Sequence, residues 1–213
     1  MTDCWSVCYH QAVDVKPLRV RQAEATRSLL IDIARRNFTE RGYAATSIDD
    51  VIREAGVARG ALYHHFPGKE ALFRAVYETV EAEVVTKVLA AAAAQTEPMA
   101  SVRAGLGAFL DGCLEPAFRR IVVLESVSVL QTGVLEVGID PVELPMLRRV
   151  LDPLLGSARF GELALDALAY VALGGLYGAS LFIARADDPA VARTEVDLVL
   201  DTLVAGLVRG ADS

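Results

Sequence analysis

The segment Thr46-Ser-Ile-Asp-Asp-Val-Ile-Arg-Glu-Ala-Gly-Val-Ala-Arg-Gly-Ala-Leu-Tyr-His-His-Phe66 decides the fold of this 213-residue chain. Its first half has apolar residues at the i, i+3, i+4, i+7 spacing of one helix face: Ile48, Val51, Ile52 and Ala55. Gly56 then predicts a turn, and a second helix is expected from about Ala58 to His65, burying Leu62 and Phe66. Two short helices joined by such a turn are typical of a helix-turn-helix, in which one helix supports a second in the major groove of DNA.

The second of these helices has the charge expected of a helix that reads DNA. The run from Gly56 to Lys69 contains no Asp or Glu, which would repel phosphate. Arg59 could bind a guanine edge or a phosphate, and Gly60 would let the backbone approach DNA closely. Phosphate contacts are expected from three further side chains: Tyr63, His65 and Lys69. The alternative interpretation is that the tyrosine and the histidines are ordinary surface or packing residues.

Charge is distributed unevenly along the chain, whose net charge is −7. Residues 16–74 hold 11 Lys and Arg against 7 Asp and Glu, whereas the residues from 75 onward hold 10 and 19. A basic N-terminal quarter followed by an acidic remainder predicts that contact with nucleic acid is confined to the N-terminal part.

Composition favours an all-α protein, because Ala, Leu and Val are abundant and Gly and Pro do not recur at the spacing of β turns. No stretch approaches the ~20 uncharged apolar residues of a membrane span. The longest candidate, Leu163 to Ala184, is interrupted by Asp166 and by glycines. The N-terminus lacks the pattern of a secretion signal, so we expect a cytoplasmic protein. Three cysteines make a disulfide framework improbable, and neither a metal site nor a cofactor is expected.

Three regions are expected along the chain. Residues 1–20, which include Pro17, are predicted to form a flexible arm. Residues 21–68 form the helix-turn-helix domain, whose first helix runs from about Ala23 to Arg41 and ends at Gly42 in a left-handed cap. Ser47 then predicts an N-cap for the second helix, with Asp50 completing a capping box.

Residues 69–213 are expected to form a helical ligand-binding and dimerisation domain. Its predicted helices are Lys69–Ala94, Met99–Leu114, Pro116–Gln131, Pro141–Leu155, Phe160–Arg185 and Pro189–Val208. The stretch Gln131–Gly138 could be a strand or a loop, because its alternation is too weak to decide.

Four segments of the N-terminal part, hereafter the head, resemble the DNA-binding domain of the tetracycline-repressor (TetR) family: Gly42-Tyr-Ala-Ala-Thr-Ser-Ile48, Ala55-Gly-Val57, Gly60-Ala-Leu-Tyr-His-His-Phe66 and Lys69-Glu-Ala-Leu72. The resemblance covers about residues 23–75 and implies an all-α homodimer of nine or ten helices per chain that usually represses neighbouring genes. Carried over by position, it implies DNA contacts at Thr46, Ser47, Arg59, Gly60, Ala61, Leu62, Tyr63, His65 and Lys69. Ala58 departs from the family, which often has Ser or Thr there, so a hydroxyl cap is absent.

The last two predicted helices, 160–185 and 189–208, carry more apolar residues than one face of a bundle needs. They are either a fully internal core or a homodimer interface, and the resemblance favours a symmetric four-helix interface. Two heads would then reach successive major grooves of a near-palindromic, double-stranded operator about 34–36 Å apart.

A ligand pocket is expected among the helices that begin at Met99, Pro116 and Phe160. The candidate lining residues are Phe109, Cys113, Phe118, Leu124, Val127, Tyr170 and Tyr177, each of which could equally be plain core. The C-terminal region has no histidine and few aromatic residues, which favours a small, largely apolar effector over a metal.

The sequence therefore predicts a DNA-binding transcriptional regulator, a repressor released by an effector, with helix Lys69–Ala94 as the lever between pocket and head. An enzyme is not expected, because no nucleophile–base pair, carboxylate pair or phosphate loop stands out. The alternative function is a helical small-molecule carrier or protein-interaction module. Salt dependence separates the two, because binding through phosphates weakens as salt rises.

Overall fold

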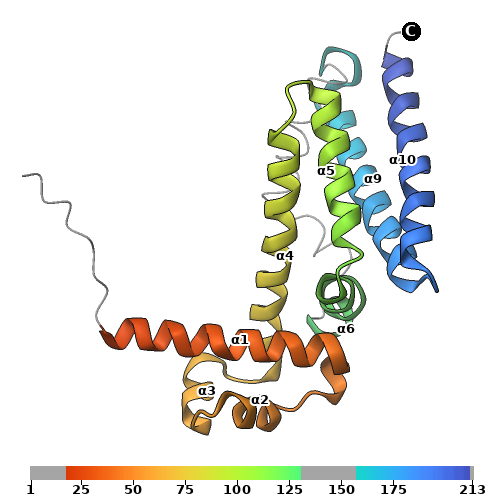
Figure 1. The fold of residues 1–213 in the computed structure, drawn as a ribbon. Helices are drawn as coiled ribbons and strands as arrows, with labels where there is room; N and C mark the ends of the chain where they lie inside the picture. Colours follow the sequence, from red (N-terminus) through yellow and green to blue (C-terminus); the bar gives the residue numbers. More distant parts are fainter. Residues whose placement is uncertain (1–17, 131–156, 212–213) are drawn as a thin grey trace, which may run out of the picture.

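The computed structural model describes residues 18–130 and 157–211, and every regular element within these ranges is a helix. In chain order they are α1 (Leu18–Ala45), α2 (Ile48–Ala55), α3 (Arg59–His65), α4 (Lys69–Ala93), α5 (Pro98–Gly112), the π-helix η1 (Phe118–Glu125), α6 (Ser126–Leu130), α9 (Ser157–Arg185) and α10 (Pro189–Ala211). Figure 1 shows α1 crossing the foot of α4, with α2 and α3 on its other side, α5 alongside α4, and α9 and α10 beyond α5. The predicted all-α architecture is confirmed.

The head, α1 to α3, is held together by apolar side chains from all three helices. Leu30, Ala34 and Phe38 of α1, Val51 of α2 and Leu62 of α3 are fully buried. Val51 and Leu62 are positions that the sequence predicted to face the core. Burying a Leu, Val or Phe side chain contributes about 1.5–3 kcal/mol, so apolar packing is the main force that fixes α3 on its support.

The residues that begin and end α2 match the sequence prediction in their main points. The Ser47 hydroxyl accepts a hydrogen bond from the Asp50 backbone N–H at 3.0 Å, as predicted for the N-cap. The Asp50 carboxylate accepts from the Ser47 hydroxyl, at 2.7 Å, and from Arg53, whereas the predicted capping box would have it accept from the Ser47 backbone N–H. Gly56 ends the helix in the left-handed conformation, φ 64°, which a β-carbon would disfavour.

The first helix begins earlier than predicted. α1 starts at Leu18, so the prediction of a flexible arm over residues 1–20 is wrong for its last three residues, and residues 1–17 lie outside the described part. Pro17 precedes the first helical residue, a position that proline tolerates because the first N–H groups of a helix have no partner within it. Gly42 breaks the helix with a positive φ of 81°, but its ψ of 170° is extended and does not fit the predicted left-handed cap.

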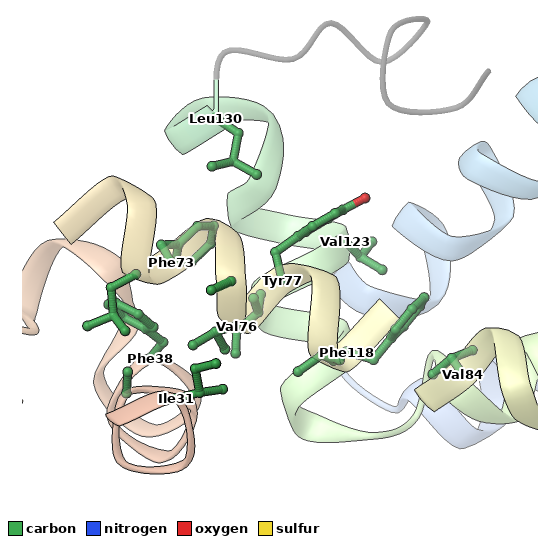
Figure 2. Packing of buried hydrophobic residues seen from close by; sticks show 14 of the residues in the cluster. Ile31, Phe38, Phe73, Val76, Tyr77, Val84, Phe118, Val123 and Leu130 are labelled. Carbon is green, nitrogen blue, oxygen red and sulfur yellow. The ribbon is translucent and has the colours of Figure 1, made fainter. Parts of the chain in front are cut away.

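One continuous apolar core joins the head to the rest of the molecule. Figure 2 shows Phe38 of α1 lying near Phe73 of α4, and Phe118 of η1 lying further along the same cluster. The Phe38 and Phe73 rings pack edge to face, with centroids 5.1 Å apart. The apolar stripe of α4 is buried throughout: Leu72, Phe73, Val76, Val80 and Val84.

The C-terminal helices follow the prediction in order but not in every detail. α5, α9 and α10 begin and end within three residues of their predicted bounds. The helix predicted over Pro116–Gln131 is corrected: its middle, Phe118–Glu125, is a π-helix followed by the short α6. Apolar periodicity over so few residues does not distinguish a π-helix from an α-helix. The predicted helix Pro141–Leu155 and the undecided stretch Gln131–Gly138 lie outside the described residues.

The prediction that no segment approaches a membrane span is wrong for α9. Its residues Asp166–Arg185 are long and apolar enough to cross a membrane by length and composition alone. In the structure α9 packs against α10 and η1, and 22% of that segment is buried within this chain. Much of its apolar surface is therefore available to a further partner.

Candidate DNA-binding surface

The exposed side of α3 holds the residues predicted to read DNA. Arg59, Gly60, Tyr63 and His64 are exposed, while Leu62 on the opposite side is fully buried. The prediction that the Leu62 side chain contacts DNA is therefore corrected: it anchors α3 on the head. Ala58 precedes the helix without a side-chain cap, as its sequence position predicted.

Arg59 of α3 forms an ion pair with Asp49 of α2. Its Nη2 atom lies 2.5 Å from Oδ1 of Asp49, and its guanidinium lies 6.0 Å from the centroid of the Tyr63 ring. Both members of the ion pair are mostly exposed, and exposed pairs contribute only about 0–1 kcal/mol. DNA can therefore displace Asp49 at low cost. Asp49 was missed from sequence because it lies on α2, ten positions before its partner.

The two residues predicted at the start of α2 differ in accessibility. Thr46 is 2% exposed, and its hydroxyl donates to the Gly42 carbonyl at 2.8 Å, so its side chain supports the turn and has no surface to offer DNA. This corrects the predicted contact through the Thr46 side chain. Ser47 is exposed, with its hydroxyl engaged in the N-cap.

Lys69 lies where the head meets α4. Its Nζ atom is 4.2 Å from the centroid of the Tyr43 ring and donates to the Ala44 carbonyl at 3.4 Å. Burial lowers the pKa of Lys69, and the nearby Glu125 carboxylate opposes that shift. Burial, with a contribution from Glu70, raises the pKa of Tyr43. Lys69 is thus half-buried, and its ammonium group already contacts the Tyr43 ring and the Ala44 carbonyl.

His65 and Ala61 are half-buried at the edges of the exposed side of α3. Burial lowers the pKa of His65, with smaller contributions from His64 and Arg27. The Arg27 guanidinium lies 5.4 Å from the centroid of the Phe66 ring, so it holds the end of α3 against α1. The predicted residues that face solvent together are therefore Arg59, Gly60 and Tyr63, with His65 beside them.

The predicted pocket residues differ in burial, and only some of them pack in one cluster. Phe109 and Phe118 pack edge to face, 6.1 Å apart, and Cys113 is fully buried in the same cluster, where burial raises its pKa to about 12. Leu124 and Tyr170 are 39% and 45% exposed in the single chain. The remaining two, Val127 and Tyr177, are half-buried.

An exposed apolar face runs along α9 and α10. Val171 and Leu198 are each 71% exposed, which contradicts a fully internal core for these positions. Other large apolar side chains exposed on these two helices are Phe182, Val191, Val199 and Leu203. Large apolar side chains exposed together on two packed helices indicate a candidate interaction site.

Two family models match the chain. The model of bacterial regulatory proteins of the tetR family matches residues 30–76, and the model of the tetracyclin repressor-like C-terminal domain matches residues 99–207. A solved TetR-family transcriptional regulator from Pectobacterium atrosepticum is 33% identical, with 88% of this chain and 96% of that chain covered and a TM-score of 0.73.

Curated relatives match mainly through the head. The HTH-type transcriptional regulator AcrR from Shigella flexneri is 38% identical over 64 residues, which is 30% of each chain. TtgR from Pseudomonas putida, named as a regulator of the same type, is 41% identical over 59 residues, 28% of each chain. The match therefore spans about a third or less of these relatives' length. Both are named as regulators and not as enzymes.

Proposed function

The chain belongs to the TetR family of bacterial regulatory proteins, and we propose that it is a cytoplasmic transcriptional repressor that a small, largely apolar effector releases from a near-palindromic operator. The matched regulators and the build of the head support this function over the alternative of a carrier or protein-interaction module.

One observation carries the proposal: the exposed face of α3 has cationic and aromatic groups and no acid of its own. Arg59 and Tyr63 project from a seven-residue helix that the buried Leu62 fixes to α1 and α2. An α-helix fits the major groove, and an arginine there binds guanine in a bidentate manner. The proposed DNA contacts are Ser47, Arg59, Gly60, Ala61, Tyr63, His65 and Lys69.

A homodimer through α9 and α10 would place two heads on one operator. The support is the exposed apolar face around Val171 and Leu198, which a second copy would cover. Two identical heads related by a twofold axis read a near-palindrome, with half-sites centred about 10 base pairs apart.

The effector would bind among α5, η1 and α9. Phe109, Cys113 and Phe118 offer a packed apolar wall there, and Val127 and Tyr177 are half-buried. Leu124 and Tyr170 would join this pocket only on closure of their surroundings or in the dimer. Binding of effector and binding of operator are linked. If the effector favours an arrangement of the heads that does not bind DNA, it lowers the affinity for operator by some factor, and operator lowers the affinity for effector by the same factor.

Selection of bound duplexes from random DNA tests the function. We expect enrichment of one near-palindromic motif by the wild type and relaxed base preference at one position of each half-site in Arg59→Ala. Arg103→Ala is the matched control, because it removes an arginine of α5 that pairs with Asp201, far from the head. Recovery of no enriched motif by the wild type would contradict the proposal.

A further inference from the structure

The body of the protein, α4 to α10, contacts the head at the end of α1, in addition to the covalent link through α4, the Phe38–Phe73 packing and the Arg35–Glu83 ion pair. At the end of α1, where Gly42 interrupts the helix, two side chains of η1 reach the backbone. Arg120 Nη1 donates to the carbonyls of Thr39 and Glu40 at 3.3 and 3.2 Å. The Glu125 Oε2 atom accepts from the Tyr43 N–H at 2.9 Å.

These contacts take the place of a backbone hydrogen bond. In a regular α-helix the Tyr43 N–H donates to the Thr39 carbonyl. Here Glu125 accepts the N–H and Arg120 donates to the carbonyl, so both groups exposed by the break at Gly42 are satisfied by the body. A cation at the last carbonyls also suits the negative end of the α1 dipole.

The π-helical winding of η1 explains why these two side chains can act together. Arg120 and Glu125 are five residues apart, and in an α-helix they would be rotated by about 140° from one another. The i→i+5 hydrogen bonding of a π-helix brings such residues onto one face. The Arg120 Nε atom and the Glu125 Oε1 atom accordingly lie 3.4 Å apart.

Gly42 is fitted to the same two side chains. It is buried, and a β-carbon built on it would lie 2.6 Å from Glu125 Oε1 and 2.7 Å from Arg120 Nη2. The absence of a side chain at this position therefore leaves room for the guanidinium and the carboxylate against the backbone. Its positive φ of 81° independently favours glycine.

We propose that Arg120 and Glu125 are positioning residues for DNA binding: they clamp the Gly42 break in α1 and so fix the orientation of the helix-turn-helix relative to the body. The assignment rests on the proposed DNA-binding function for its purpose. η1 also carries Phe118 of the proposed pocket. An effector that converts η1 from a π-helix to an α-helix would separate Arg120 from Glu125 and release the head.

The distance between head and body in the full-length protein tests the clamp without DNA. With Cys4 and Cys8 replaced by Ser, spin labels at His64→Cys and Gln95→Cys report this distance by pulsed electron spin resonance. Labelled chains are diluted with unlabelled ones, so that distances within one chain dominate. We expect one narrow peak for the otherwise unaltered chain, its loss in Glu125→Ala and Arg120→Met, and its recovery in Glu125→Gln, which keeps an acceptor oxygen for Tyr43.

Asp111→Ala is the matched control, because it breaks the 3.0 Å ion pair with Arg193 between α5 and α10, away from the head, and it should keep the narrow peak. On the selected operator, Glu125→Ala should lose discrimination between half-site spacings while keeping base preference within a half-site. An unchanged peak in both Glu125→Ala and Arg120→Met overturns the clamp even if DNA binding stands. Failure to bind DNA would instead contradict the proposed function and leave the distance result valid.

Discussion

The Arg59 guanidinium on α3 and the Asp49 carboxylate on α2 are 2.5 Å apart, so the main base-reading candidate is paired with an acid of the neighbouring helix. Phosphate or a guanine edge must replace this carboxylate, which also repels the DNA backbone at close range. Asp49 therefore restrains DNA affinity.

Replacement of Asp49 by Asn should strengthen operator binding by about two- to fivefold, because an exposed ion pair is worth at most about 1 kcal/mol. Fluorescence anisotropy at constant ionic strength measures the change. Asp32→Asn, an equal charge change on α1, corrects for the general effect of charge. If Asp49→Asn gained no more affinity than this control, Asp49 would have no local role.

Arg59 and Lys69 should differ in what they contribute. Arg59→Ala should cost about 1–3 kcal/mol on the selected operator and relax base preference at one position of each half-site. Lys69→Ala should weaken all duplexes alike and reduce the magnitude of the salt slope by about 1. Titrations of operator and scrambled duplex at several salt concentrations separate these effects. Equal losses of specificity in both variants would refute the division of roles.

Introduction of charge on the α9–α10 face should break the dimer. Leu198→Glu places a carboxylate at a position that is 71% exposed in the single chain but would be buried between two chains. Sedimentation should show a monomer with unchanged helicity, whereas Leu89→Glu, at an exposed apolar site on α4, should remain dimeric. A dimeric Leu198→Glu variant would place the interface elsewhere.

Cys113 should be chemically silent while the protein is folded. Burial raises the pKa of its thiol to about 12, so almost no thiolate exists at pH 8, and the side chain is inaccessible. In a variant with Cys4 and Cys8 replaced by Ser, Ellman's reagent should detect no thiol until denaturant is added, and then one. Rapid reaction in the native state would show that the α5–η1 core opens readily.

Because of His65, the free energy of unfolding should fall as pH decreases. Its folded-state pKa is lowered from 6.5, chiefly by burial, so the unfolded chain binds the proton more readily. The contribution is therefore fully present above the unfolded pKa and is lost as pH falls through the folded pKa. Urea unfolding at pH 7.5 and 5.5 should show a smaller pH dependence in His65→Gln, whereas His64→Gln should retain most of it. Equal pH dependence in wild type and His65→Gln would remove this role.

Local chemistry and periodicity predicted the head well. The Ser47 cap, the Gly56 turn and the buried face containing Leu30 and Phe38 depend on neighbours within one or two helical turns, which the sequence displays directly. Periodicity also predicted that Leu62 is buried. Family position suggested a DNA contact there, but position within a motif does not specify which side of a helix a residue occupies.

Contacts across distant segments could not be predicted in this way. Arg120 and Glu125 are five residues apart, a spacing that does not pair on an α-helix, and their backbone partners lie about 80 positions earlier. Asp49 and Arg59 meet only because the turn at Gly56 folds α2 against α3. The start of α1 was misplaced because a proline permits a helix to begin directly after it.

Competition between DNA and an unrelated polyanion tests the central claim most directly. Labelled operator from the selection is bound at moderate ionic strength and challenged with excess unlabelled operator, scrambled duplex or heparin. We expect unlabelled operator to displace the label at far lower concentration than either competitor, and this difference between operator and scrambled duplex to shrink in Arg59→Ala. Equal displacement of the wild type by all three would contradict sequence-specific DNA recognition through α3.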